Sequence, residues 1–231
     1  MDPTELLSLL ARSLAKIDHD RPWAMRLCQA CVDLLRAEGG SLTVSAGLGE
    51  RAAVSTPGVF EQLEPLQEVL GEGPVHQAMA EDRLVVQRID RMVEGFPIFS
   101  QLAGPVSSDV MLYAVPMRVG GSVVGVFSFY ATADPLVRSE EDLQFIADAV
   151  GAALLNDLES LDWSEQAQFH QATGMVVAQL GVPPDDALAM IRARAFSQSR
   201  SLQAVAVDVI ERRLTFSFDE DGDNTERTEE P

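Results

Sequence analysis

The chain has 231 residues, enough for one or two domains with a sizeable apolar core. Hydrophobic residues make up 46% and charged residues 23%, and no apolar run approaches the roughly 18 residues that cross a bilayer. The acidic N-terminus lacks the basic region of a secretory signal, and two cysteines three residues apart suit a reducing compartment. We therefore expect a cytoplasmic protein without membrane spans or disulfides.

The formal net charge of −19 argues against general electrostatic binding to nucleic acid, because phosphates attract Lys and Arg. The charge is unevenly distributed along the chain. Residues 164–218 carry five arginines and five acidic residues, whereas the segments 1–163 and 219–231 are strongly acidic. The segment 164–218 is therefore the part of the chain that repels a polyanion least.

Apolar residues at helical spacing predict helices over 4–17 and 23–37. Thr4 is a candidate cap for the first helix, and we expect Gly39 and Gly40 to end the second in a left-handed conformation. The next residues alternate between apolar and polar, which is typical of a half-buried strand: Leu42, Val44 and Ala46 against Thr43 and Ser45. Residues 51–55 are a plausible hairpin partner for that strand.

The next elements predicted are a helix over 59–70, a short helix over 75–80 and a short strand over 84–86. The strongest strand signal lies in 111–119 and 122–131, joined by Gly120 and Gly121 as a tight hairpin turn. Helices interspersed with an antiparallel hairpin indicate an α+β domain, in which helices flank an antiparallel sheet.

A helical pattern begins at Ser139, which is followed by three acidic residues in the first turn. No Pro or Gly cluster separates this pattern from residues 164–180, so we expect one long helix to link two domains. The apolar residues on one face of this helix can cover the sheet domain, pair with a second copy of the chain, or do both. The apolar stripe consists of Leu143, Ile146, Val150, Leu154, Leu158 and Leu161.

Residues 164–214 show no strand signal and predict three short helices. The first ends at Gly181, the second begins at Pro183-Pro184, and Ser201 caps the third. Residues 219–231 are acidic and polar, so we expect a disordered tail. The apolar positions predicted to be buried are Ala187, Leu188, Ile191 and Ala195 in the second helix and Leu202, Val205, Ala206, Val209 and Ile210 in the third.

Four segments together resemble a GAF domain: residues 70–74 (Leu-Gly-Glu-Gly-Pro), 113–117 (Tyr-Ala-Val-Pro-Met), the turn 120–121 and 124–126 (Val-Gly-Val). The resemblance covers about residues 25–155. It implies a domain that senses a small ligand and often dimerises. We assign His76, Tyr113 and Phe127 to the ligand pocket that the resemblance implies; we expect no haem and no metal site, and the identity of a cofactor is unknown.

The C-terminal segments resemble an ANTAR domain over about residues 163–216: 170–176 (His-Gln-Ala-Thr-Gly-Met-Val), 186–188 (Asp-Ala-Leu), 191–195 (Ile-Arg-Ala-Arg-Ala) and 200–206. Such domains bind RNA hairpins, commonly in pairs, and act as transcription antiterminators. The chain is thus similar to GAF–ANTAR regulators. The domains expected are an N-terminal helix (1–20), a GAF-like domain (21–160), an ANTAR-like domain (161–218) and the tail (219–231).

The RNA-binding residues that we infer are polar or conformationally special residues of the ANTAR-like segment. Each has a structural alternative: the arginines can be solvated surface charges, Gly174 can serve helix packing, and His170 can be structural. Many ANTAR domains carry Lys where this chain has Thr173, so one phosphate contact is absent. The residues are His170, Gln171, Thr173, Gly174, Arg192, Arg194 and Arg200.

Enzyme motifs are not evident in the sequence. Cys28 and Cys31 form a CxxC pair inside a predicted helix, without the second pair of a zinc site, and we interpret them as small buried hydrophobes. Some GAF proteins reduce free methionine sulfoxide with cysteines near the pocket, but this chain has no cysteine after Cys31. We expect a non-enzymatic homodimeric RNA-binding antiterminator. The first alternative is a ligand or redox sensor whose C-terminal helices contact proteins, and the second is an enzyme built on the GAF pocket.

Overall fold

The computed structural model describes residues 2–45, 51–89, 96–103, 110–131, 138–157, 164–218 and 224–228. Contacts divide the chain into two units, one of Met1–Gln67 with Glu72–Asp162 and one of Trp163–Pro231 with Glu68–Gly71. Among the described segments, no helix combines the length and apolarity needed to span a membrane.

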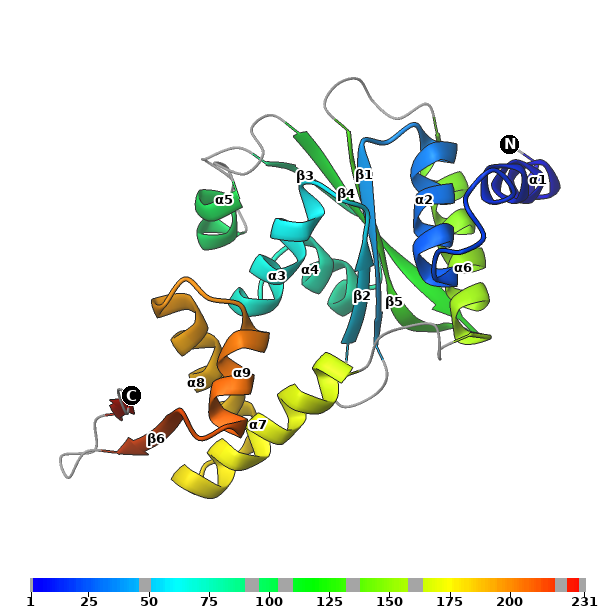
Figure 1. Cartoon of the computed structure of the whole chain (residues 1–231). Coiled ribbons are helices and arrows are strands. Elements are labelled where there is room, and N and C mark those ends of the chain that lie inside the picture. The colour runs from blue at the N-terminus through cyan, green and yellow to red at the C-terminus, as the bar shows by residue number, and fades with distance from the viewer. Residues whose placement is uncertain are drawn as a thin grey trace. The chain divides into compact units, whose positions relative to one another are not determined.

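The first unit is built on a five-stranded antiparallel sheet in the order β2-β1-β5-β4-β3 (Figure 1). Helices flank the sheet, as the α+β prediction requires. The β4–β5 turn is the tight hairpin predicted: Gly120 and Gly121 have φ of 61° and 83°, which suit a two-residue turn. The strands are β1 (Gly39–Ser45), β2 (Arg51–Ser55), β3 (Val85–Ile89), β4 (Val110–Val119) and β5 (Ser122–Ala131).

The helices of the first unit cover opposite faces of the sheet (Figure 1). One face carries α2 (Trp23–Leu35) and α6 (Glu140–Leu155), against which α1 (Pro3–Leu14) packs from outside. The other face carries α3 (Phe60–Leu70) and α4 (Pro74–Glu81). A further helix, α5 (Pro97–Ala103), is held near α4 by Phe99 N, which donates to Glu72 Oε1 at 2.9 Å.

Two predicted helix ends differ from the structure. Asp2, not Thr4, caps α1, since its carboxylate accepts from the Thr4 N–H at 3.2 Å. The left-handed residue after α2 is Arg36, with φ of 53°. Gly39 and Gly40 instead begin β1, where a Cβ would lie 2.5 Å from Tyr130 Cε1 and 2.7 Å from Val32 Cγ2, respectively. The two glycines therefore permit close packing rather than a helix end.

Strand β1 is buried on both faces, so the prediction of a half-buried strand is wrong. Leu42 and Val44 face α2 and α6, as expected for apolar residues. The alternating residues Ser41 and Thr43 are only 0% and 4% exposed, because α3 covers them. The sheet is therefore the middle of three layers, and its α3 side contains polar groups.

Helix α6 ends at Leu155, so the expected continuous linking helix is wrong; Asn156 is its C-terminal cap. The described part of the apolar stripe is already buried inside the single chain, with Leu143, Ile146, Val150 and Leu154 at most 3% exposed. These side chains seal the sheet and cannot form a dimer seam. Leu158 and Leu161 lie outside the described residues.

The second unit contains α7 (Ser164–Leu180), α8 (Pro184–Ser197) and α9 (Leu202–Ile210), which pack on one another. Three predicted boundaries are confirmed: Gly181 has φ of 66° after α7, Pro184 opens α8, and the Ser201 hydroxyl accepts from Ala204 N at 3.1 Å. The three helices share a core of Ala172, Val176, Ala187, Ile191, Ala195, Leu202, Val205, Ala206 and Val209.

A strand pair follows α9, although no strand was predicted there. Strand β6 (Leu214–Phe218) pairs with β7 (Asn224–Thr228) in antiparallel register. Leu214 and Phe216 are each 4% exposed and extend the helical core, and Phe216 N donates to Gln179 Oε1 at 2.9 Å. Strand β7 occupies part of the segment that was expected to be a disordered tail, whose other residues lie outside the described ranges.

Candidate functional site

Between the sheet and α3 of the first unit lies a group of buried or partly buried polar side chains, here called the polar layer. It consists of Ser41, Thr43, Ser128, Glu64 and Gln67. The first three project from β1 and β5, and the other two come from α3. Because strand residues alternate between faces, these hydroxyls face α3 while their apolar neighbours face α2 and α6.

Two hydroxyls of the polar layer have no hydrogen-bond partner in the part of the chain that the structure describes. Ser41 and Ser128 are directly opposite each other on neighbouring strands and are both 0% exposed. Neither Oγ makes a hydrogen bond to any described residue. An unpaired buried polar group costs roughly 1–3 kcal/mol, and folded proteins contain few of them. The pair is therefore a place where a ligand or an ordered water gains hydrogen bonds.

Helix α3 brings two longer polar side chains to this face. Thr43 Oγ1 donates to Glu64 Oε2 at 3.4 Å. Gln67 is 1% exposed; its Oε1 accepts from Val75 N at 3.0 Å, whereas its Nε2 has no partner among the described residues. A Cβ at Gly73 would lie 2.6 Å from Gln67 Oε1, so the glycine leaves room for this amide.

His76, which the sequence assigns to the ligand pocket, lies in α4 beside the polar layer. Its Nδ1 is 2.9 Å from Arg51 Nη1, and its Nε2 is 3.1 Å from the carbonyl oxygen of Gln67. Arg51 Nη1 also lies 3.1 Å from Nε2, so the arginine approaches both ring nitrogens. The histidine thus links β2 to the end of α3.

Tyr113 and Phe127 do not lie on the face that carries the polar layer, so the structure does not bring them together with His76. Both project to the opposite face and belong to an aromatic core under α2 and α6. Tyr113 stacks on Phe129 with ring centroids 4.9 Å apart, and Phe127 lies 5.2 Å from the same ring. Tyr113 pairs with Phe129 across β4 and β5, and Phe127 lies two residues from Phe129 on the same strand. All three side chains therefore project from the same face of the sheet.

Both cysteines lie in α2 and are 0% exposed, as expected for small buried hydrophobes. Burial raises the pKa of the Cys28 thiol to about 12, with a smaller opposing effect from a hydrogen bond to the Thr56 backbone. Burial also raises the pKa of Cys31. Both thiols are therefore protonated at neutral pH and poorly suited to nucleophilic chemistry.

In the second unit, His170, Gln171 and Gly174 lie on the exposed side of α7. A Cβ at Gly174 would meet nothing within 4 Å, so the structural alternative of helix packing is wrong for this glycine. Thr173 is half-buried, and its Oγ1 donates to the Phe169 carbonyl of its own helix at 2.9 Å. Helix α7 thus presents three of the four inferred RNA-binding residues to solvent.

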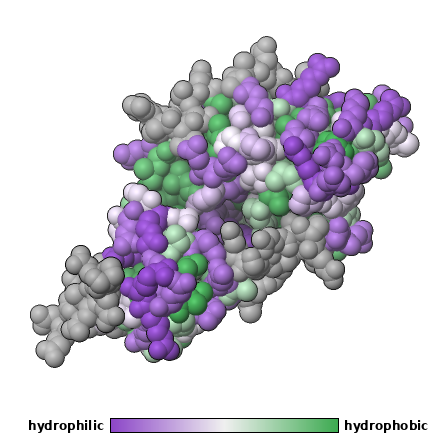
Figure 2. Space-filling view, viewed as in Figure 1, coloured by the Kyte–Doolittle hydropathy of each residue, from purple (hydrophilic) through white to green (hydrophobic). Residues whose placement is uncertain are grey.

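The three predicted arginines do not form one surface. Arg192 is partly buried and Arg194 is 9% exposed, which contradicts a solvated position for Arg194. Arg200 lies in the α8–α9 turn and is exposed, but its guanidinium is bound to α9. Figure 2 shows hydrophilic residues gathered over α9 and the adjoining end of α8.

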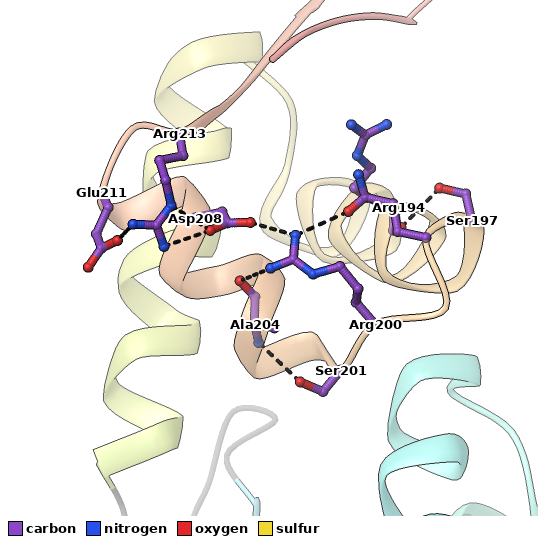
Figure 3. Close-up of polar contacts among 9 residues, drawn as sticks. Arg194, Ser197, Arg200, Ser201, Ala204, Asp208, Glu211 and Arg213 are labelled. Carbon is purple, nitrogen blue, oxygen red and sulfur yellow. Dashed lines mark hydrogen bonds and ion pairs between the residues drawn. The ribbon is translucent and has the colours of Figure 1, made fainter. Parts of the chain in front are cut away.

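An ion-pair network centres on Asp208 of α9 (Figure 3). Its two carboxylate oxygens accept from Arg200 at 2.5 Å and from Arg213 at 2.7–2.8 Å. Partial burial by itself would raise the pKa of Asp208, but the hydrogen bonds from the two arginines outweigh that effect and hold it below its ordinary value. The carboxylate is therefore charged at neutral pH.

Sequence reasoning missed the groups that partner the predicted residues. Asp208 bonds Arg200 and Arg213 together, and no spacing rule in the sequence indicates this arrangement. Phe196 is 47% exposed on α8, an aromatic surface that a nucleobase could stack on. The sequence of β1 contained one indication of the polar layer: its polar positions are occupied by the short side chains of Ser41 and Thr43 and not by long charged ones. No cluster of metal-ligating residues occurs among the residues described.

The chain matches no family model, and no curated protein matches it. Solved structures similar to it include the GAF domain of a phosphoenolpyruvate-protein phosphotransferase from Coxiella burnetii, with 12% identity over 68% of this chain and 96% of that chain and a TM-score of 0.46. The GAF domain of A. aeolicus NLH2 in an inactive state has 14% identity over 64% and 90%, with a TM-score of 0.40. Free methionine-R-sulfoxide reductase from Neisseria meningitidis, in complex with its substrate, has 16% identity over 72% and 94%, also with a TM-score of 0.40.

Proposed function

We propose that the chain is a cytoplasmic regulator with a GAF-type sensor unit and an ANTAR-type RNA-binding unit. The sensor unit binds a small polar ligand at the polar layer. The C-terminal unit binds RNA hairpins and acts in transcription antitermination. The observation that carries the sensor function is the pair of buried, unpartnered hydroxyls of Ser41 and Ser128.

The chemistry of the polar layer defines the class of ligand. Each serine hydroxyl can donate and accept one or more hydrogen bonds, and the free Nε2 of Gln67 donates. The Glu64 carboxylate in the same layer disfavours an anionic group beside it. A small neutral or cationic molecule with hydrogen-bond acceptors on two sides fits these groups best.

The exposed face of α7 supports the RNA-binding function. Glycine is unfavourable inside a helix, and at position 174 no neighbouring group requires the absence of a side chain. The absence of a side chain would instead allow an outside partner to approach the helix backbone closely. His170 and Gln171 flank it with groups that stack on bases or bond to their edges. A flat RNA surface can therefore reach the α7 backbone.

A homodimer is part of this proposal, because two weak RNA-binding units gain affinity from their high effective concentration when held together. The stripe residues Leu143, Ile146, Val150 and Leu154 cannot supply the interface, since the single chain already buries them. Sedimentation equilibrium of the full chain tests the pairing. A monomer at the concentrations at which RNA binds would remove it.

The ligand site is tested with Ser41→Ala and Ser128→Ala against a library of cellular metabolites, read by thermal unfolding. Each substitution removes an unpaired buried hydroxyl, so the unliganded protein should be as stable as the wild type or more stable by about 1 kcal/mol. A metabolite that raises the Tm of the wild type should lose its effect on both variants. Ser8→Ala is the matched control, because the Ser8 hydroxyl is exposed and bonds only its own helix.

The RNA-binding unit is tested with tandem RNA hairpins carrying randomised loops. The full chain should retain a subset of sequences, and Gln171→Ala should weaken their binding whereas the exposed Gln62→Ala of α3 should not. Retention of no RNA would favour the alternative in which the C-terminal helices contact proteins. An enzymatic thiol role has no support in the buried, protonated cysteines, and a methionine sulfoxide reductase assay of the purified chain should show no turnover.

A further inference from the structure

The guanidinium of Arg200 is held along one side by α9 (Figure 3). Its Nη1 donates to Asp208 Oδ2 at 2.5 Å, and its Nη2 donates to the carbonyl oxygen of Ala204 at 3.2 Å. A longer contact of 3.4 Å joins Nη1 to Gln198 Oε1. Two firm anchors from one helix fix both the position and the plane of the group.

Asp208 is itself fixed by a second arginine. Its Oδ1 accepts from Arg213 Nε at 2.8 Å and from Arg213 Nη2 at 2.7 Å, and its side chain is only 15% exposed. Arg213 also pairs with Glu211 through Nη1. The carboxylate therefore cannot rotate away from Arg200 without breaking several contacts.

One edge of the Arg200 guanidinium remains available. The side chain is 38% exposed, and no described residue accepts a hydrogen bond from its Nε. Nε–H and the adjacent Nη2–H form the side-on fork of an arginine, which matches two acceptors in one plane. Guanine O6 and N7 and a pair of phosphate oxygens are such acceptors in RNA.

We propose that Asp208 is a positioning residue, which orients Arg200 so that its free edge makes a bidentate contact with RNA. The inference rests on the RNA-binding function proposed above. A free arginine loses rotamer entropy when it binds, whereas Asp208 has already ordered this one before RNA arrives. The orientation gained outweighs the local repulsion between the carboxylate and RNA.

The direction in which one substitution changes RNA affinity distinguishes a positioning role from a simple effect of charge. Asp208→Asn removes a negative charge, so bulk electrostatics predicts tighter RNA binding, whereas positioning predicts binding about 10-fold weaker. Glu211→Gln is the matched control: it removes the same charge three residues away, from a side chain that is 49% exposed and does not touch Arg200. Its RNA affinity should be unchanged or slightly higher.

The probe is the tandem RNA hairpin that the wild-type chain selects most strongly from the randomised-loop library, measured by fluorescence anisotropy. In an Arg200→Ala background, Asp208→Asn should have no further effect on affinity. Arg200→Lys, which keeps Asp208 paired but lacks the fork, should bind as weakly as Arg200→Ala. Circular dichroism melting confirms that each variant folds, and the Arg200→Lys result tests the fork even if Asp208→Asn does not fold.

A second measurement needs no RNA. The NMR order parameter of the Arg200 Nε–H bond in the free chain should be high in the wild type and fall in Asp208→Asn. Equal mobility in the two proteins, or tighter RNA binding by Asp208→Asn, overturns the positioning role while leaving RNA binding in place. Failure of the wild type to select any RNA overturns the RNA-binding function and this inference with it.

Discussion

At the scale of single residues, glycines with crowded and open surroundings serve different purposes. A Cβ at Gly125 would lie 2.1 Å from the Thr43 carbonyl oxygen and 2.7 Å from Met117 Cε, so the sheet requires glycine there. Gly174 in α7 and Gly181 after it meet nothing within 4 Å, but only Gly181 has a positive φ, of 66°. Gly174 is thus the one of the three that neither packing nor backbone conformation explains.

Gly174→Ala should stabilise the chain by about 1 kcal/mol, because Ala is the better helix former and has space for its methyl group. The same methyl group should weaken RNA binding if the α7 backbone is approached by RNA. Urea unfolding and fluorescence anisotropy measure the two effects. Gly181→Ala is the control, since its positive φ should make it destabilising. Greater stability with unchanged RNA affinity would contradict an RNA contact at Gly174.

The buried thiols predict a dependence of stability on pH. Burial raises the pKa of Cys28 from 9.0 to about 12, so the folded state holds its proton over a range in which the unfolded state releases it. The stability present below pH 9 should therefore decline as the pH rises from 9 toward 12. Urea titrations at several pH values measure this, and Cys28→Ala should flatten the decline. A wild-type profile no steeper than that of the variant would contradict it.

At the scale of elements, the sequence predicted the turns and helix caps that neighbouring residues determine. The Gly120-Gly121 turn and the Ser201 cap follow from backbone conformation and from a hydroxyl three residues before its donor. The burial of β1, in contrast, depends on helix α3, which lies further along the chain. A serine at position 41 is compatible with solvent or with a covering helix, and only α3 decides between them.

The candidate sites divide in the same way. His170, Gln171 and Gly174 are exposed on one side of α7, as their helical spacing permits. The face on which Tyr113 and Phe127 lie depends on which helices cover each side of the sheet, and the strand pattern is apolar on both sides there. The partner of Arg200 lies eight residues away at Asp208, across a turn whose conformation the sequence did not predict.

The cap of α6 gives a prediction for a whole element. Ser139 Oγ accepts from Asp142 N at 3.2 Å and satisfies one of the N–H groups that the first turn leaves unpaired. Ser139→Ala should lower the free energy of unfolding by about 1 kcal/mol, and Ser139→Asp should restore most of it. Ser8→Ala, on the exposed side of α1, should change stability by less than about 0.5 kcal/mol. Equal losses from both alanine variants would rule out a capping role.

At the scale of the whole molecule, charge limits the way in which this chain can bind RNA. The net charge is −19, and residues 164–218 are neutral only because five arginines balance five acidic residues. Two of those arginines, Arg200 and Arg213, are engaged with Asp208. The chain therefore has few cations to place on phosphates, and the proposed RNA binding would have to rely on shape, stacking and oriented hydrogen bonds.

This balance predicts a weak dependence of RNA binding on salt. A protein that neutralises six to ten phosphates loses about 10³–10⁵ in affinity between 50 and 200 mM salt, because binding releases that many counterions. With one or two phosphate contacts in each of two paired units, this chain should lose only about 10- to 150-fold over the same range. At the lowest salt, repulsion from its acidic surface should even reduce binding, since screening lengths there exceed about 10 Å. Anisotropy titrations from 20 to about 300 mM salt give the slope, and a slope steeper than about −4 would contradict binding by so few charges.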